Sequence, residues 1–238
     1  MKQFTSILLS FLLLSLFACK KSDGEVKLEI AGQFQTNDFL LNTPYTTASG
    51  QYMEFIDFKF YISKITLINK KDEEIELSEV LLYKFSSPEN IQASVPAGTY
   101  KALRFDIGLD EELNASDPNT FEVEHPLSYA HNTHWDWASM YRFVMMDGRI
   151  DTVQADNFAK TFSYHTGFKE LWRTTTIEQE FIVSEDENLT LTLNLQIDQI
   201  FDGTSPVNIF EDNVSHSLTD IATRLSDNFI EAISLEIQ

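Results

Sequence analysis

Residues 189 to 197 alternate strictly between apolar and polar side chains, and this pattern constrains the fold more than any other stretch of the chain. Four leucines and Ile197 are separated by threonine, asparagine and glutamine. Successive side chains of a β-strand point to opposite faces, so the alternation predicts a strand with one buried side and one solvent-facing side. Shorter stretches of the same pattern recur along the chain from Val26 onward.

One predicted strand carries a change of parity. Its apolar positions are even-numbered up to Ile62 and odd-numbered from Ile65, which predicts an inserted residue, a β-bulge, near Ser63-Lys64. Asp147-Gly148 lies between two further strand-like segments, and this dipeptide favours a tight hairpin because glycine tolerates a positive φ. We therefore expect the chain to reverse direction at Asp147-Gly148.

Helical spacing of apolar residues is clearest near the C-terminus, where a short helix is predicted after Ser217 with Asp220 placed for a capping interaction. A last strand is predicted at 233–237. The chain shows no repeat of fixed period and no linker rich in proline or glycine. The predicted fold is one all-β domain over residues 26–238, an antiparallel β-sandwich of immunoglobulin-like or Greek-key type with one or two short helices.

The N-terminal residues have the pattern of a targeting segment. Lys2 precedes an apolar run over 7–17, and Leu16-Phe17-Ala18-Cys19 resembles a bacterial lipobox. By that resemblance residues 1–18 are a signal peptide, and cleavage leaves Cys19 lipidated as the membrane anchor. Residues 19–25 then form a tether, and the protein is expected at the cell envelope, on the periplasmic or surface face of the outer membrane. An unlipidated signal peptide is the alternative reading.

Charge and cysteine content exclude several kinds of partner and site. The formal net charge is −20, with 37 acidic residues against 17 lysines and arginines. Nucleic acid would be repelled, whereas cations would be attracted, although the acidity also serves solubility. Cys19 is the only cysteine. A disulfide framework and a thiolate metal site are therefore both excluded.

The stretch from His125 to Gly167 concentrates groups that bind metals. It holds four of the five histidines, two of the three tryptophans and three of the five methionines. Neutral imidazole binds copper, zinc, nickel or iron, while thioether sulfur selects soft ions, Cu(I) above all. Histidine and methionine together therefore point to copper.

The spacing of the histidines and tryptophans in this stretch does not fit a single helix or a single strand. His131 and His134 share a face only in a helix, whereas Trp135 and Trp137 share a face only in an extended segment. We expect a loop that leads into a strand beginning near Tyr141. His165 is predicted on a separate strand, so the tertiary fold would have to bring these groups together.

Four motifs stand out along the chain in a fixed order. They are Phe58-Lys59-Phe60-Tyr61-Ile62-Ser63-Lys64-Ile65, Pro96-Ala97-Gly98-Thr99-Tyr100 running to Phe105-Asp106-Ile107-Gly108, Trp135-Asp136-Trp137 followed by Tyr141, and Tyr164-His165-Thr166-Gly167. This is the order seen in the MbnP-like proteins, which the chain resembles from Val26 to about Asn228. These are β-sandwich proteins, periplasmic or lipid-anchored, named for a copper-binding, methanobactin-associated member.

The resemblance implies a copper ion bound by histidines. His165 matches the family's histidine before a glycine, and Trp135 and Trp137 match its W-x-W pair. In some relatives a tryptophan beside the metal is oxidised to kynurenine by a dihaem peroxidase-like partner. A protein without catalytic activity of its own is expected.

This chain departs from the family pattern in its early part. Copper-binding relatives also use an early histidine, but no histidine precedes His125 here. Either His131 or His134 replaces that ligand, with Met140 and Tyr141 lining the site, or the fold is kept and the site is lost.

The residues also bear on two other classes of function. Trp135, Trp137 and Trp172 have acidic neighbours and could stack on sugar rings, which would make the protein a glycan-binding module of the cell surface. An enzyme is disfavoured, because the chain has no Gly-x-Ser-x-Gly elbow, no His-Glu-x-x-His helix and no phosphate-binding glycine loop.

Overall fold

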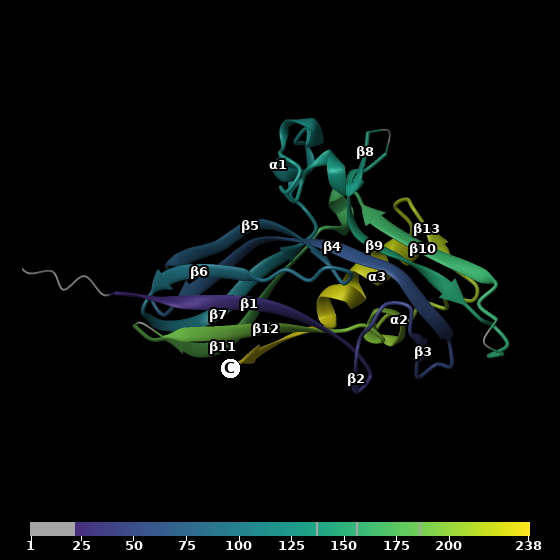
Figure 1. The fold of residues 1–238 in the computed structure, drawn as a ribbon, viewed down its shortest axis with the longest axis horizontal. Helices are drawn as coiled ribbons and strands as arrows, with labels where there is room; N and C mark the ends of the chain where they lie inside the picture. Colours follow the sequence, from purple (N-terminus) through teal and green to yellow (C-terminus); the bar gives the residue numbers. More distant parts are fainter. Residues whose placement is uncertain (1–21, 137, 156, 186) are drawn as a thin grey trace, which may run out of the picture.

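The computed structural model describes residues 22–136, 138–155, 157–185 and 187–238, and shows an all-β sandwich (Figure 1). The expected signal peptide, Cys19 and Trp137 lie outside the described residues. The first strand begins at Asp23, within the segment expected to be a tether. Among the described residues, no helix is long and apolar enough to cross a membrane.

The smaller sheet holds five strands in the order β14-β12-β1-β2, with β6 paired to β1 along the edge that β12 does not occupy. The alternating stretch forms β12 as predicted, and its inward leucines are buried. β12 pairs with β1 in parallel, so segments from opposite ends of the chain lie side by side. The strands are β1 (Asp23–Phe34), β2 (Asn37–Asp38), β6 (Ile91–Pro96), β12 (Asn188–Gln196) and β14 (Ile233–Ile237).

The larger assembly of nine strands has the order β11-β7-β4-β9-β10-β13, with β3 and β5 paired to β4 and β8 paired to β9. β10 and β13 pair in parallel, and the remaining pairs are antiparallel. The strands are β3 (Pro44–Thr46), β4 (Tyr52–Asn69), β5 (Glu74–Lys84), β7 (Gly98–Ile107), β8 (His134–Trp135), β9 (Met140–Ile150), β10 (Lys160–Gly167), β11 (Arg173–Val183) and β13 (Val214–Ser215).

Helices are few, and the longest is the one predicted from the sequence. Its N-cap is Thr219, whose side chain accepts a hydrogen bond from the backbone N–H of Ala222, so the helix begins at Asp220 rather than being capped from Ser217. The helices are α1 (Glu111–Asn114), α2 (Gln199–Asp202) and α3 (Asp220–Glu231), with 3₁₀ turns η1 (Pro118–Thr120), η2 (Tyr129–His131) and η3 (Lys169–Leu171).

The larger sheet separates two hydrophobic clusters. Side chains along β4 point alternately to one cluster and to the other. Phe58 and Phe60 belong to the main core between the sheets, whereas Tyr61 belongs to a smaller cluster on the other side. The segment with α1, η1, η2 and β8 rises above the sheets and covers this smaller cluster (Figure 1). The predicted bulge is present, because the β4 register shifts there and Lys64 has a φ of 49°.

The hairpin predicted at Asp147-Gly148 is wrong. Strand β9 runs straight through both residues, and Gly148 pairs with Phe162 on β10 and Phe55 on β4. A Cβ atom at Gly148 would lie 2.2 Å from the carbonyl oxygen of Glu54 and 2.4 Å from the Phe162 ring. The glycine therefore serves close packing in a central strand instead of a turn.

Candidate functional site

The site lies on the face of β9 and β10 that points away from the main core. Phe162 and Tyr164 of β10 are buried in the main core, so alternation turns Ser163 and His165 to the opposite face. Asp147 of β9 is directly opposite Ser163 in the antiparallel register. Two neighbouring strands therefore place a hydroxyl, a carboxylate and an imidazole together.

His165 is oriented by Asp147. The Nε2 atom of the ring lies 2.8 Å from Oδ2 of the carboxylate, and the histidine side chain is 11% exposed. Because an ionised carboxylate only accepts hydrogen bonds, this contact places the imidazole proton on Nε2. Nδ1 then carries a lone pair, and this buried atom has no hydrogen-bond partner within the described residues.

His216 completes a pair of imidazoles. It follows β13, which the parallel pairing with β10 brings alongside, and its ring stacks on that of His165 with centroids 4.6 Å apart and planes within 10°. Its Nε2 lies 2.7 Å from Oγ of Ser163, and this Oγ lies 2.6 Å from Oδ1 of Asp147. The hydroxyl donates to the carboxylate and accepts from His216, which leaves the lone pair of His216 on Nδ1.

The charges of the site are mutually dependent. Burial alone would raise the pKa of Asp147, but hydrogen bonds from His165 and Ser163 hold this pKa below its ordinary value. Partial desolvation of its ring and the neighbouring His165 lower the pKa of His216, which favours its neutral form. Neutral imidazoles beside an ionised carboxylate are the forms that a metal cation requires.

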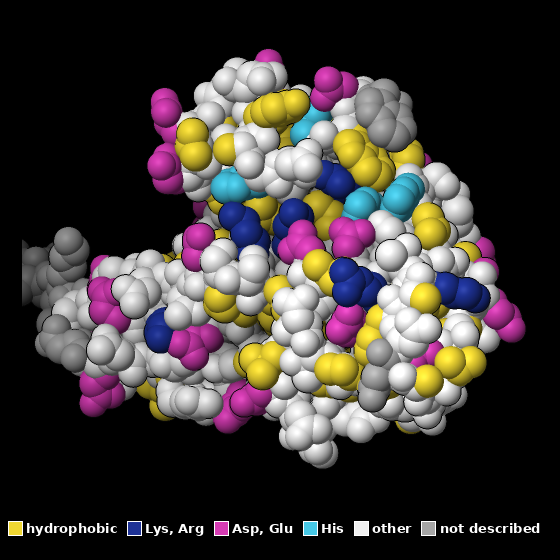
Figure 2. All heavy atoms as spheres, turned by 45° about the vertical axis from the view of Figure 1, so that its right-hand side comes forward, with side chains coloured by type: hydrophobic (Ala, Val, Ile, Leu, Met, Phe, Trp, Pro, Cys, Tyr) yellow, Lys and Arg dark blue, Asp and Glu magenta, His cyan; other side chains and the backbone are white. Residues whose placement is uncertain are grey.

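Trp135 forms one wall of the site. Its ring centroid lies 5.5 Å from that of His165 and 5.7 Å from that of His216. Arg142 covers the indole with its guanidinium carbon 4.5 Å from the ring centroid. Arg142 is held there by hydrogen bonds from its guanidinium to the backbone carbonyls of Asn132 and Thr133. Figure 2 shows histidine side chains gathered close to basic and hydrophobic ones on one face of the molecule.

The other predicted ligands lie elsewhere. His134 is next to Trp135 in β8, but its ring packs on Tyr141 with centroids 4.7 Å apart and its Nδ1 contacts Asp136. His131 bonds to the ammonium of Lys84 and to a backbone carbonyl, so both ring nitrogens are engaged.

The predicted lining residues also differ in position. Met140 is 38% exposed and borders a pocket with His134, whereas Tyr141 is buried and donates its hydroxyl to the carbonyl of Leu127. The structure thus brings His165 to Trp135 and His216, but not to His131.

Sequence reasoning missed His216, Asp147 and Arg142. His216 lies far along the chain in a short irregular segment, so nothing local marks it. Asp147 was assigned to a turn, although its place two residues after Met145 on an alternating strand could have put it on the outer face.

The residues offer a transition-metal ion such as copper two imidazole nitrogens. The fit rests on the buried Nδ1 of His165, which has no protein donor, and on Nδ1 of His216, whose other ring nitrogen bonds to Ser163. His216 is exposed, so its ring has room to turn. Across the described ranges, no group of three or more histidine, cysteine, aspartate or glutamate side chains is arranged to hold an ion.

Fold and site together define a β-sandwich protein with a histidine pair on the outer face of one sheet, walled by a tryptophan. The chain belongs to the MbnP family, whose model matches residues 23–219. The solved structure of MbnP from Methylosinus trichosporium has the same fold, with a TM-score of 0.52 and 14% sequence identity over 84% of this chain and 82% of that chain. No curated protein matches the chain.

Proposed function

We propose that the protein is a non-catalytic copper-binding protein of the cell envelope, which holds the ion through Nδ1 of His165 and Nδ1 of His216. The observation that carries this proposal is the buried Nδ1 of His165, which has no hydrogen-bond partner while the opposite ring nitrogen is fixed by Asp147. A buried acceptor without a donor is costly, and a bound cation removes that cost.

The surroundings of His165 match those of a metal ligand. Histidines that bind metals commonly donate their second ring N–H to a carboxylate, which fixes the tautomer and makes the ligand more basic. Asp147 does this directly for His165 and through Ser163 for His216. Imidazole nitrogen favours copper over most other divalent ions by intrinsic affinity, and the net charge of −20 attracts cations.

Trp135 would shield the ion from water on one side and report its binding. Its indole lies in contact distance of both imidazoles, so a bound copper ion is expected to quench its fluorescence. Attachment to the membrane through Cys19 and a dihaem peroxidase-like partner stay predictions from the sequence.

The indoles support a glycan-binding role less well. Arg142 covers one face of Trp135, and Trp172 packs against the smaller hydrophobic cluster with its Nε1 atom buried. Stacking on a sugar needs an open ring face, which neither of these two side chains fully offers.

The test is the copper content of protein purified after expression with copper. We expect His165→Ala to hold one equivalent less than the wild type and to lose the quenching of indole fluorescence, and His216→Ala to bind more weakly. His125→Ala is the matched control, because its Nδ1 already accepts a hydrogen bond from the N–H of Leu127. Equal copper content in wild type and His165→Ala would overturn the proposal.

A further inference from the structure

We propose a second soft-metal site on the opposite side of β8, formed by Nε2 of His134 and the thioether sulfur of Met140, with Cu(I) as its ion. This site does not depend on the histidine pair at β10, and it shares no ligand with that pair.

Alternation along β8 separates the two sites. Trp135 contacts His165 and His216, whereas the ring of His134 packs edge-on against Tyr141. Adjacent residues of a strand point to opposite faces, so the two side chains cannot share a site while the strand is extended.

The hydrogen bonding of His134 repeats that of His165. Its Nδ1 lies 2.8 Å from Oδ1 of Asp136, so the imidazole proton belongs on Nδ1 and the lone pair on Nε2. The side chain is 7% exposed, and Nε2 is buried without any hydrogen-bond partner in the described part of the chain. His134 and His165 are the two described histidines that combine a carboxylate on one ring nitrogen with a buried, unpartnered nitrogen on the other.

A pocket of about 240 Å³ adjoins His134, and Met140 borders it. Met140 is 38% exposed and has a φ of 63°, a conformation that L-residues with long side chains rarely adopt. Met140 is the first residue of β9 and pairs with Trp135 of β8, and it lines the same pocket as His134. Met140 thus offers this pocket a partly exposed thioether from a residue held in an uncommon backbone conformation.

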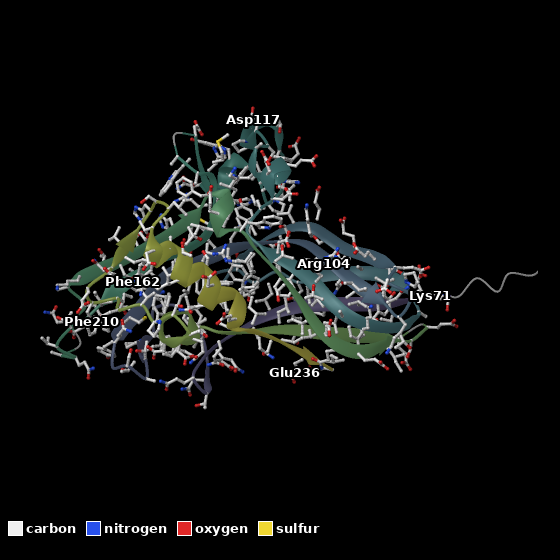
Figure 3. All side chains as sticks on the ribbon, turned by 180° about the vertical axis from the view of Figure 1, so that it is seen from behind. Lys71, Arg104, Asp117, Phe162, Phe210 and Glu236 are labelled. Atoms are coloured by element: carbon white, nitrogen blue, oxygen red, sulfur yellow. The ribbon has the colours of Figure 1, made fainter. Side chains whose placement is uncertain are left out.

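Acidic side chains give this pocket a negative potential. Asp117 and Asp136 both line it, and Asp117 lies at the tip of the protruding segment (Figure 3). Oδ1 of Asp117 already accepts hydrogen bonds from the backbone and side-chain N–H groups of Asn119. The carboxylates therefore attract a cation, while the nitrogen of His134 and the sulfur of Met140 supply the ligands.

The donor set selects the ion. Thioether sulfur binds soft monovalent ions such as Cu(I), whereas calcium, magnesium and manganese prefer sets of oxygen ligands. Ag(I) has the same softness and does not change oxidation state in air, so it serves as the probe.

The experiment is a titration of the purified protein with Ag(I), followed by equilibrium dialysis and metal analysis. The wild type is expected to bind two equivalents. His134→Phe keeps the ring packing on Tyr141 but removes the nitrogen. This variant should therefore bind one equivalent of Ag(I) fewer than the wild type, and copper should still quench its Trp135 fluorescence. Asp136→Asn should weaken the same site by roughly 10- to 100-fold, as for other carboxylates that orient a ligand histidine.

Met140→Leu tests the sulfur, because leucine has a similar volume and no donor. This variant should weaken Ag(I) binding at the His134 site. Equal stoichiometry and affinity in the wild type and His134→Phe would overturn this proposal and leave the histidine pair untouched. Loss of a site in His134→Phe but not in His165→Ala would instead overturn the proposed function alone.

Discussion

Arg142 lies over the indole of Trp135, with 4.5 Å between the guanidinium carbon and the ring centroid. Arg142 is buried, and its hydrogen bonds to the carbonyls of Asn132 and Thr133 connect the protruding segment to β9. One side chain therefore holds the wall of the candidate site against the strand that carries Asp147.

Removing this guanidinium should loosen the protruding segment. Arg142→Met keeps the length of the side chain but removes the guanidinium hydrogen bonds to the carbonyls of Asn132 and Thr133, of which only Thr133 keeps a donor, the backbone N–H of residue 142. We therefore expect a loss of about 2 kcal/mol in the free energy of unfolding. The Trp135 emission should shift to longer wavelength as water reaches the ring. Arg149→Met on the same strand is the control, because its 52% exposed side chain makes only a long ion pair with Glu54. An unchanged emission spectrum would contradict the structural role of Arg142.

The carboxylate of Asp147 should matter for metal affinity more than for folding. Asp147→Asn keeps the shape but weakens the orientation of His165, and we expect copper affinity to fall by roughly 10- to 100-fold. Competition with a copper chelator measures this change. Asp57, directly opposite Asp147 on β4, pairs with Lys59 instead of a histidine. Asp57→Asn should therefore bind copper as the wild type does; equal weakening by both variants would point to a general charge effect.

Tyr83 should make the protein sensitive to alkali. Burial, with the charge of Glu29 adding to it, raises the pKa of this phenol to about 12 from 10.0. Because the folded-state pKa is the higher one, its contribution to stability is complete below pH 10 and is lost as pH rises towards 12. Urea unfolding at pH 8 to 12 should show this fall, and Tyr83→Phe should reduce its slope. Tyr129→Phe, at a residue that is 63% exposed, should leave the slope as it is.

Gly148 should not tolerate a methyl group. A Cβ atom there would meet the backbone oxygen of Glu54 at 2.2 Å and the Phe162 ring at 2.4 Å. Gly148→Ala should therefore lower the free energy of unfolding by about 3 kcal/mol. Gly98→Ala is the matched control, since a Cβ at Gly98 meets nothing within 4 Å and should change stability by less than about 0.5 kcal/mol. Thermal or urea unfolding of the two variants measures the difference, and equal stability would contradict the close packing of β9.

Local patterns predicted much of the fold. The alternation in β12, the parity change at the Lys64 bulge, the helix from Asp220 and the last strand are all present. Each depends on side chains that are close in sequence. The hairpin at Asp147-Gly148 failed because a glycine needed for close packing between strands has the same local signature as a glycine in a turn.

The site was less predictable, because it depends on pairings between distant segments. The sequence placed His165 and Trp135 in one cluster, and the structure sets their rings 5.5 Å apart. His216 lies beside β10 because β13 pairs with β10 in parallel, and no local sequence pattern predicts that pairing. His134 adjoins Trp135 in sequence, but strand geometry turns it away.

The parallel pairing of β1 with β12 has a consequence for how the chain folds. Nine residue pairs join 25–33 to 188–196, so the edge of β1 that faces β12 stays unpaired until residue 196 has been synthesised, although β2 and β6 can pair with its other edge earlier. Contacts so distant in sequence slow folding, and an early strand left waiting exposes its edge to other chains. During synthesis this edge of β1 is therefore open to pairing with other chains, and a chaperone that covers residues 23–34 should raise the yield of folded protein.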